Sequence, residues 1–512
     1  MQTISQNLDP EVVTQPGEPA KPAAPAASEA AKLPPSRGAS WLSSIQSLNI
    51  AATDPAPAQA QKPKGETTAA DPVAAAIESI KETFPEVPST IEATGLTEPF
   101  IEHLLLKVIY SRGERTGRQL SIATGLKWSI IEPILENAKR LHLVSVRKSM
   151  GMGSISAYFQ LSDTGRAMTR DYLQTNSYAG RAPVPLEQYA EMVRRQRFPD
   201  NWLSREMLVE AFKGLVLTDG VISQLGPAIN SGKSFLIYGQ PGNGKTFLAE
   251  ALFNIQSEPI YVPYAIEAQG QIIQVFDPVY HTPLDVVKEE ETPSIFQSTD
   301  EITYDSRWFK TKRPWIMTGG ELTMQLLDLS YNEASKVYDA PFQLKANNGI
   351  YLIDDFGRQK VSPAEVLNRW IVPMERKIDY LSFNTGGKMC VPFECFLIFS
   401  TNLAPEQIGD EAFLRRIQYK MMMKSPSEQE FAEIFCQIVE KKKFECEPEV
   451  MERFIEAKYR MGGKKMRRCH PRDVLSHAED LIKFERRPWK LTNDLLDHAF
   501  DGCFVTMDHR SD

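Results

Sequence analysis

The chain has 512 residues, of which 42% are hydrophobic, and its formal net charge is −8. This length exceeds that of one ordinary domain and predicts about three. The negative charge argues against a protein that coats nucleic acid along its whole surface, although it is compatible with a local basic patch. No apolar run approaches the roughly 18 residues of a membrane-spanning helix, and the N-terminus lacks a secretory signal pattern. We therefore expect a cytoplasmic protein that does not insert into membranes.

The cysteines predict no disulfide framework. All six lie in the last quarter of the chain, none forms a C-x-x-C pair, and only Cys469 stands next to a histidine, His470. Reduced thiols are therefore favoured over a metal site at this pair.

Residues 1–90 predict a disordered tail that is rich in proline and alanine. This composition buries too little apolar surface to offset the entropy of ordering the chain. Within the tail, apolar residues recur at helical spacing over 41–50. That stretch is either a docking peptide that folds on a partner or a stray apolar cluster, and the pattern favours neither.

Residues 91–180 predict a winged helix-turn-helix domain with three helices and a β-hairpin. The helices open at 97–99, 117 and 128, and the strands cover 143–146 and 157–161. In such a domain the third helix is the one that enters a DNA major groove. The charged residues are Lys127, Glu132, Glu136, Lys139 and Arg140 in or beside that helix, and Arg147 and Lys148 in the wing. The mixed signs on the helix favour contact with protein, while the basic wing leaves DNA binding open.

The most specific motif follows an apolar run at 235–238 and precedes a helical pattern at 247–253. It matches G-x-x-x-x-G-K-[ST], which in this context predicts a phosphate-binding P-loop. Glycines let backbone N–H groups approach a phosphate, and the helix directs its positive end at the anion. Lys245 is expected to reach the β- and γ-phosphates of ATP, and Thr246 to bind Mg²⁺. The expected nucleotide-binding residues are Gly239, Gln240, Pro241, Gly242, Asn243, Gly244, Lys245, Thr246 and Phe247.

A second apolar run, 349–353, ends in the acid pair Asp354 and Asp355. Unbroken apolar runs are typical of parallel strands covered on both faces, and such sheets bind ligands at the carboxyl ends of their strands. The pair is therefore expected to face the phosphates. Asp354 would belong to the Mg²⁺ shell, and Asp355 would orient and deprotonate the attacking water.

A polar, proline-containing stretch at 180–185 predicts a linker before the ATPase module.

Three further segments follow, and their order along the chain supports a family resemblance. An apolar strand at 396–401 ends in Asn402, an arginine pair closes the stretch 410–417, and a helix opens at 470. Together with the P-loop and the acid pair, these segments resemble the AAA+ ATPases over residues 196–508.

The resemblance implies roles for four more residues. Asn402 would be sensor 1, which helps to position the water. Arg415 and Arg416 would be arginine fingers that reach the site of a neighbouring subunit, where loss of a finger costs on the order of a thousandfold in rate. Arg472 would be sensor 2, which contacts the γ-phosphate from the helical lid of its own subunit.

Two departures from the family pattern stand out. The second Walker B acid is Asp355 where the family has glutamate, and a displacement of about 1 Å can cost on the order of a hundredfold in rate. We therefore expect slow hydrolysis or a water-bridged base. About 85 residues separate the strand at 260–262 from the acid pair, which predicts an elaboration of the core. Tyr264 is a weak candidate for a substrate-threading loop, and a core or surface tyrosine is favoured.

Residues 379–384 and 389–393 flank a glycine-containing turn and predict a β-hairpin. The hairpin is similar to one inserted before sensor 1 in the AAA+ branch that contains MoxR-type chaperones. The whole arrangement resembles bacterial winged-helix plus AAA+ ATPases with chaperone-like activity, which are associated with Flp pilus assembly.

The expected fold is α/β: a P-loop AAA+ parallel sheet at 196–424 with a helical lid at 425–512, preceded by the winged-helix domain and the disordered tail. The expected function is an ATPase that couples Mg-ATP binding and hydrolysis to remodelling or assembly of protein partners. A homo-oligomeric ring, with a hexamer favoured, follows from the same resemblance. The alternatives are a DNA-associated ATPase that reads DNA through 91–180, and a nucleotide-gated switch with little turnover.

Overall fold

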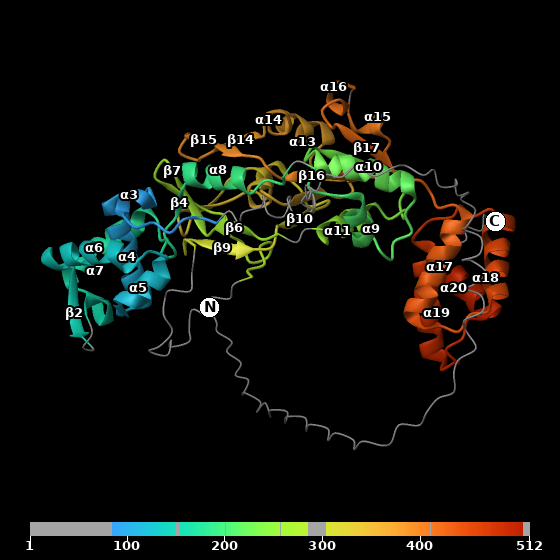
Figure 1. Cartoon of the computed structure of the whole chain (residues 1–512), viewed down its shortest axis with the longest axis horizontal. Coiled ribbons are helices and arrows are strands. Elements are labelled where there is room, and N and C mark those ends of the chain that lie inside the picture. Colours follow the sequence, from blue (N-terminus) through green and yellow to red (C-terminus); the bar gives the residue numbers. More distant parts are fainter. Residues whose placement is uncertain are drawn as a thin grey trace, which may run out of the picture. The chain divides into compact units, whose positions relative to one another are not determined.

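The computed structural model describes residues 84–149, 153–199, 201–255, 258–284, 304–409 and 411–504 (Figure 1). Nearly all of the expected tail, including its apolar stretch at 41–50, lies outside these residues. So does the tip of the predicted wing, at 150–152.

Five parallel strands form a central sheet in the order β10-β13-β16-β5-β17. Their bounds are Trp315–Thr318 (β10), Ile350–Ile353 (β13), Phe396–Thr401 (β16), Phe235–Tyr238 (β5) and Tyr419–Met422 (β17). Parallel neighbours need crossover connections, which helices commonly supply. The mixed α/β fold with a parallel sheet, as predicted for 196–424, is therefore present.

Helices cover both faces of this sheet (Figure 1). Side chains alternate between the faces of a strand, so that Phe235 enters one core and Leu236 the other. The first core includes α10 (Asp219–Asn230) and α11 (Lys245–Phe253), and the second includes α13 (Pro363–Arg369). Because both faces are buried, the strands read as unbroken apolar runs, as the sequence indicated.

The elaboration before the acid pair forms a second, mixed sheet in the order β11-β12-β8-β7-β4. These strands are Ser330–Asn332, Val337–Asp339, Gln271–Gln274, Ala265–Ala268 and Val184–Pro185. The predicted strand at 260–262 is present as β6 (Ile260–Pro263), and it pairs antiparallel with β9 (Trp308–Thr311). Tyr264 lies between β6 and β7 and contacts the rings of Tyr178 and Phe276, so it is a core residue.

The interpretation of 180–185 as a linker is wrong. Strand β4 pairs with β7, and Ala182 and Val184 are fully buried in two different cores. Helix α8 (Leu186–Arg195) follows directly. The proline content of the stretch signalled a loop, but burial of its small apolar residues between the two cores outweighs that local signal.

The predicted hairpin is confirmed as β14 (Ile378–Ser382) paired antiparallel with β15 (Lys388–Pro392). Leu381, Met389 and Val391 are buried in the core of the mixed sheet. One face of the hairpin is therefore packed against the elaboration.

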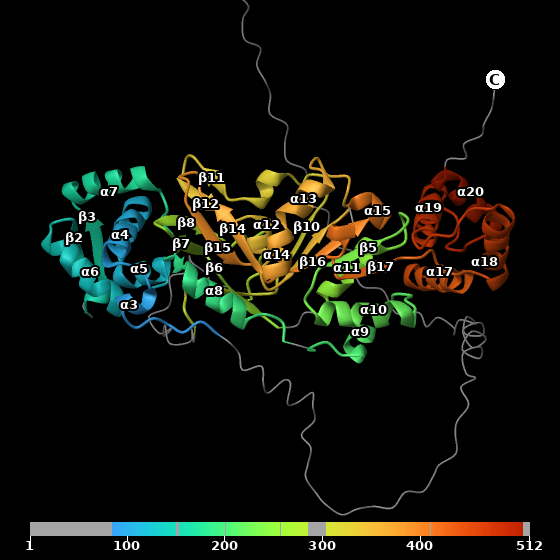
Figure 2. The same ribbon diagram turned by 90° about the horizontal axis from the view of Figure 1, so that it is seen from above.

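The elements predicted for residues 91–180 are all present (Figure 2). They are α4 (Glu98–Arg112), α5 (Gly117–Thr124), α6 (Trp128–Arg140), β2 (Val144–Ser149) and β3 (Ala157–Leu161). A short strand β1 (Arg115–Thr116) completes a sheet in the order β1-β3-β2, and an additional helix, α7 (Asp163–Thr175), follows. Thr97 caps α4 by accepting from the N–H of Phe100, as its position before Pro99 suggested.

Arg307 ties these helices to the elaboration. Its guanidinium is buried, donates to the carbonyl of Thr94 at 2.8 Å, and pairs with the equally buried Asp305. The turn after α5 lies close by, because a Cβ at Gly125 would be only 2.9 Å from the carbonyl oxygen of Ser306.

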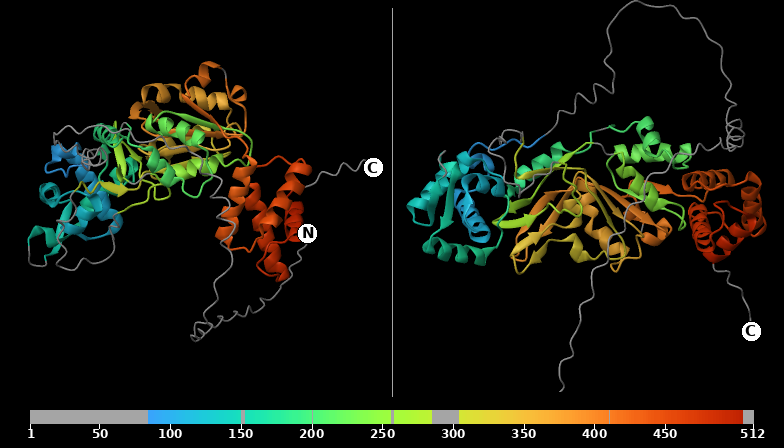
Figure 3. Two further views of the ribbon diagram at one scale, coloured as in Figure 1. Left: turned by 45° about the vertical axis from the view of Figure 1, so that its right-hand side comes forward. Right: turned by 90° about the horizontal axis from the view of Figure 1, so that it is seen from below.

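The C-terminal segment is helical, as predicted (Figure 3). Its helices are α17 (Glu428–Lys442), α18 (Pro448–Ile455), α19 (His470–Glu485) and α20 (Asn493–Cys503), with a π-helical turn at Glu456–Met461. They share a core of aromatic and aliphatic side chains. Within the described part of the chain, no helix is long and apolar enough to cross a membrane.

Candidate nucleotide site

The glycine-rich turn leaves β5 and enters α11 through backbone angles that favour glycine. Gly242 has φ +80° and Gly244 has φ +84°. Gly239 has φ +142°, and a Cβ there would lie 2.4 Å from the carbonyl oxygen of Met423. A side chain at these positions would be strained or would clash, so the three glycines are required by the turn itself. The turn leaves the amino end of α11 open to an anion.

Lys245 is buried, and its hydrogen-bond partners among the described residues are all neutral. Its ammonium donates to the carbonyl oxygens of Gly239 at 2.9 Å and Gln240 at 3.1 Å, and to Oδ1 of Asn402 at 2.7 Å. Burial lowers the pKa of Lys245, the carboxylates Asp354 and Asp355 oppose that effect, and the charge of Arg467 adds to it. A buried ammonium with no ion pair favours an incoming anion.

Thr246, at the start of α11, and Asp354, directly after β13, are joined by a hydrogen bond. The hydroxyl of Thr246 donates to Oδ2 of Asp354 at 2.8 Å. The two residues are 108 positions apart in the sequence. They meet because β5 and β13, which are separated only by β16, end at the same edge of the parallel sheet. Hydroxyl and carboxylate oxygens are ligands that Mg²⁺ accepts, so the donor set fits this ion.

Asp355 sits at a strained position, with φ +48°. Its Oδ1 accepts from Nδ2 of Asn402 at 2.8 Å. Asn402 thus lies between Lys245 and Asp355 and bonds to both. The unusual backbone turns Asp355 outward at the end of β13, where its carboxylate is exposed. Strained backbone of this kind is often found at functional sites.

The remaining P-loop residues differ in exposure. Asn243 is buried, and its amide donates to the carbonyl of Met423 and the hydroxyl of Ser425, both at 3.4 Å. Phe247, in contrast, is 57% exposed on the first turn of α11. The structure therefore brings together Lys245, Thr246, Asp354, Asp355 and Asn402, which the sequence had placed in one site.

The helical segment contacts the P-loop through residues that the sequence did not single out. Nη1 of Arg467 donates to the carbonyl of Pro241 at 3.0 Å, and the N–H of Cys469 donates to the carbonyl of Gly242 at 2.9 Å. The Sγ of Cys469 lies 2.7 Å from where a Cβ on Gly242 would be. The only available signal was the basic run at 464–468, directly before the predicted sensor 2 helix.

The predicted sensor 2 residue, Arg472, pairs with an acid of its own helix and has no described contact with the P-loop. Arg472 is exposed on the first turn of α19, and its guanidinium pairs with Asp473 at 3.0 Å. The same segment contributes a partly buried pair between Arg468 and Glu430 at 2.7 Å. None of the described contacts of Arg472 involves the P-loop.

The two predicted finger residues lie between α16 (Glu411–Leu414) and β17. Nε of Arg416 donates to Glu375 at 2.7 Å within the same chain. Arg415 is exposed, and no described carboxylate pairs with it. Of the two residues, Arg415 is the more exposed.

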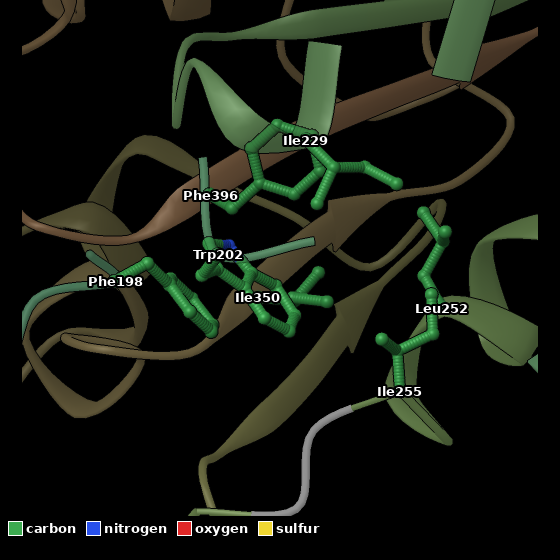
Figure 4. Close-up of a pocket in the computed structure, with 7 residues that line it drawn as sticks. All are labelled: Phe198, Trp202, Ile229, Leu252, Ile255, Ile350 and Phe396. Carbon is green, nitrogen blue, oxygen red and sulfur yellow. The ribbon is translucent and has the colours of Figure 1, made fainter. Parts of the chain in front are cut away.

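An apolar pocket lies at the opposite edge of the central sheet (Figure 4). Its lining residues are Phe198, Trp202, Ile229, Leu252, Ile255, Ile350 and Phe396. Ile350 and Phe396 are the first residues of β13 and β16, whereas the P-loop and the acid pair follow the carboxyl ends of their strands. The pocket is therefore separate from the candidate nucleotide site.

Comparison with known proteins gives one family match in sequence. A profile described as a domain of unknown function (DUF8689) matches residues 427–502, which span the helical C-terminal segment. A search among curated proteins finds no match.

Three solved structures show distant likeness. NtrX from Brucella abortus is 13% identical over 57% of this chain and 57% of its own, with a TM-score of 0.33. The complex of the BchI and BchD subunits of magnesium chelatase is 14% identical over 56% and 91%, with a TM-score of 0.29. RuvB of Thermotoga maritima, as an A156S mutant, is 14% identical over 56% and 69%, with a TM-score of 0.31. The match thus spans just over half the length of NtrX. Likeness at this level supports no functional argument, which rests instead on the geometry of the site.

Proposed function

We propose that the protein is an ATPase of the AAA+ type that couples binding and hydrolysis of Mg-ATP to remodelling or assembly of protein partners. One observation carries the proposal: Asn402 bridges the P-loop lysine and the second acid of the Walker B pair, with bonds of 2.7 and 2.8 Å. A P-loop lysine, a water-orienting acid and a polar group between them are the parts that phosphoryl transfer to water requires.

Each residue has a part in this proposal. Lys245 would exchange its carbonyl partners for phosphate oxygens, which bind an ammonium more strongly because they are charged. Thr246 and Asp354 would hold Mg²⁺, which supplies neutralising charge at the β- and γ-phosphates. Asp355, oriented by Asn402, would accept a proton from the attacking water. Arg415 or Arg416 of an adjacent subunit would complete the site in a homo-oligomeric ring, for which a hexamer is favoured.

The Lys245→Ala variant tests ATP binding. ATP at about a hundred times its dissociation constant stabilises a binding protein by roughly 2.7 kcal/mol. We expect a thermal-shift measurement to show this stabilisation in the wild type and to lose it in Lys245→Ala. Lys213→Ala is the matched control, because Lys213 is an exposed lysine that pairs with Glu210. Equal stabilisation of wild type and Lys245→Ala by ATP would refute the proposal.

Contact with protein rather than DNA is favoured for the N-terminal domain. Two of the basic side chains that could approach a phosphate backbone already have acidic partners: Lys139 pairs with Glu136 at 3.4 Å, and Arg147 pairs with Glu114 at 3.2 Å. Duplex DNA binding by the full chain, weakening steeply with salt, would instead favour the DNA-associated alternative. A cytoplasmic location is part of the same proposal.

A further inference from the structure

The segment that leads into α19 lies on the P-loop, and its arginines differ in their partners. Arg468 pairs with Glu430 at 2.7 Å, and Arg472 pairs with Asp473 at 3.0 Å. Arg467 has no carboxylate partner among the described residues, and its hydrogen bond is to the neutral carbonyl of Pro241. A guanidinium has five N–H donors, so most of those on Arg467 remain available.

Arg467 also borders a basic pocket. The pocket is lined by Gly463, Lys464, Lys465, Arg467, His470 and Phe504, and these residues include no acid. The ammonium of Lys464 lies 4.3 Å from the centre of the Phe504 ring. Three cations thus line one pocket of the helical segment without a counter-charge among the lining residues, and one of them, Arg467, contacts the P-loop. An anion of high charge is the ligand that fits this arrangement.

The close approach of Arg467 to the P-loop is firmly fixed. Its Cδ and Cβ lie 3.4 and 3.8 Å from where a Cβ on Gly242 would be. The N–H of Cys469, two residues later, bonds to the carbonyl of Gly242, and a Cβ at that glycine would strike the Sγ of Cys469. Gly242 is therefore required for a second reason besides the turn of the P-loop, because the absence of a side chain lets the helical segment pack against this loop.

We propose that Arg467, rather than Arg472, is the arginine of the helical segment that binds the phosphates of ATP. The inference rests on the proposed function, since it concerns the same nucleotide. Arg467 binds the outer phosphates bidentately through its free donors, while its remaining N–H keeps the segment on the P-loop. Arg472 remains paired with Asp473 and takes no part in phosphate binding.

The test measures binding of ATP, ADP and AMP by the full chain, with a fluorescent ATP analogue as the displaced probe. Arg467→Ala is compared with the rival variant Arg472→Ala and with the surface control Arg453→Ala, whose arginine pairs with Asp497 on the same helical segment. Lys245→Ala serves as the positive control for loss of binding.

We expect Arg467→Ala to weaken ATP binding roughly tenfold or more, as for a lost charge-assisted contact, and AMP binding far less. Arg472→Ala and Arg453→Ala are expected to bind ATP within about twofold of wild type. Arg467→Lys keeps the charge but not the planar fork, and should lie between wild type and Arg467→Ala. This variant keeps the test decisive if the alanine variant does not fold.

Three outcomes overturn the inference. The first is ATP binding by Arg467→Ala at the wild-type level. The second is a loss in Arg472→Ala as large as in Arg467→Ala. The third is an equal loss for all three nucleotides in Arg467→Ala, which would mean that Arg467 only docks the helical segment. If Lys245→Ala itself still binds ATP, the proposed function fails instead, so the two failures are distinguishable.

Discussion

At the scale of single residues, Asp355 is the side chain that the proposed function assigns to deprotonate the attacking water. Its carboxylate is one methylene shorter than a glutamate, and its φ of +48° is an angle that few residues other than glycine, asparagine and aspartate adopt readily. The bond from Asn402 at 2.8 Å holds the short carboxylate in a defined direction. Aspartate therefore adopts this backbone conformation readily, but its carboxylate extends less far toward the attacking water than that of a glutamate would.

Asp355→Asn is expected to bind ATP and to stop turnover, because an amide accepts no proton from water. Steady-state phosphate release and nucleotide binding are the two measurements. Asp354→Asn is the matched comparison, and it should instead weaken Mg²⁺-dependent binding. Unchanged phosphate release by Asp355→Asn would show that Asp355 is not the base.

His281 makes stability depend on pH. The ring is fully buried; its Nδ1 accepts from the N–H of Asp277, and its Nε2 donates to the carbonyl of Lys345. Burial lowers the pKa of His281 to about 4. Burial acts in the same direction on His470, whose pKa is also lowered to about 4. The folded protein keeps both rings neutral, whereas the unfolded chain takes up protons near pH 6.5.

Because the unfolded state binds more protons between about pH 6.5 and 4, the free energy of unfolding should fall as the pH drops through this window. Each histidine contributes about 1.4 kcal/mol per pH unit within it. Denaturant titrations at pH 7.5 and 5 would measure the slope. His281→Gln should flatten it, while the exposed His142→Gln should not. An unchanged slope in His281→Gln would contradict the assignment.

At the scale of elements, a polar contact at the start of β9 fixes the N-terminal helices to the elaboration. Arg307 and Asp305 are each 2% exposed, and the guanidinium also bonds to Thr94 and Gln188. Residues 84–175 are therefore tied to the elaboration through buried groups.

Arg307→Met is expected to destabilise the protein by about 3–5 kcal/mol, because it leaves the Asp305 carboxylate buried without its partner. Chemical denaturation would measure the loss. The double variant Asp305→Asn, Arg307→Met should recover part of it. Arg147→Met, which breaks an exposed pair with Glu114, is the control and should cost below about 1 kcal/mol. A similar small loss in Arg307→Met would mean that the buried pair does not hold the domain.

At the scale of the whole molecule, the proposed function predicts a site that is complete only between subunits. Arg416 has an intrachain partner in Glu375, whereas Arg415 is exposed next to it. The backbone of this stretch is anchored, because Ser234 donates to the carbonyl of Arg416 and Ile417 is fully buried. A rigid backbone that presents an exposed guanidinium suits a contact with a second copy.

Specific ATPase activity should therefore rise with protein concentration. Arg415→Ala should lose hydrolysis while still binding ATP, and mixing it with Lys245→Ala subunits should restore part of the activity. In some interfaces of the mixture, one variant supplies an intact pocket and the other an intact finger. Arg416→Ala, tested in the same way, distinguishes a finger from an intrachain structural arginine. Activity that is independent of concentration, with no rescue in either mixture, would rule out a shared site.

The local chain determined most of the elements and the core of the site. Unbroken apolar runs predicted β5, β13 and β16, because a strand buried on both faces has no polar side to show. The glycine pattern of the P-loop predicted its turn, because few other residues adopt those angles. Asp354 and Asp355 could be placed beside the P-loop because the carboxyl ends of parallel strands meet at one edge of the sheet. The resemblance to AAA+ ATPases added Asn402 to the same site.

Only the tertiary structure decided what distant segments do to one another. Arg467 and Pro241 are 226 positions apart, and nothing in either local pattern specifies their bond. The pairing of Arg416 with Glu375 and the burial of Val184 in strand β4 of the mixed sheet are of the same kind. Local patterns report the periodicity and conformational freedom of a segment, whereas the partner of a charge or a small apolar residue depends on which other segment folds against it.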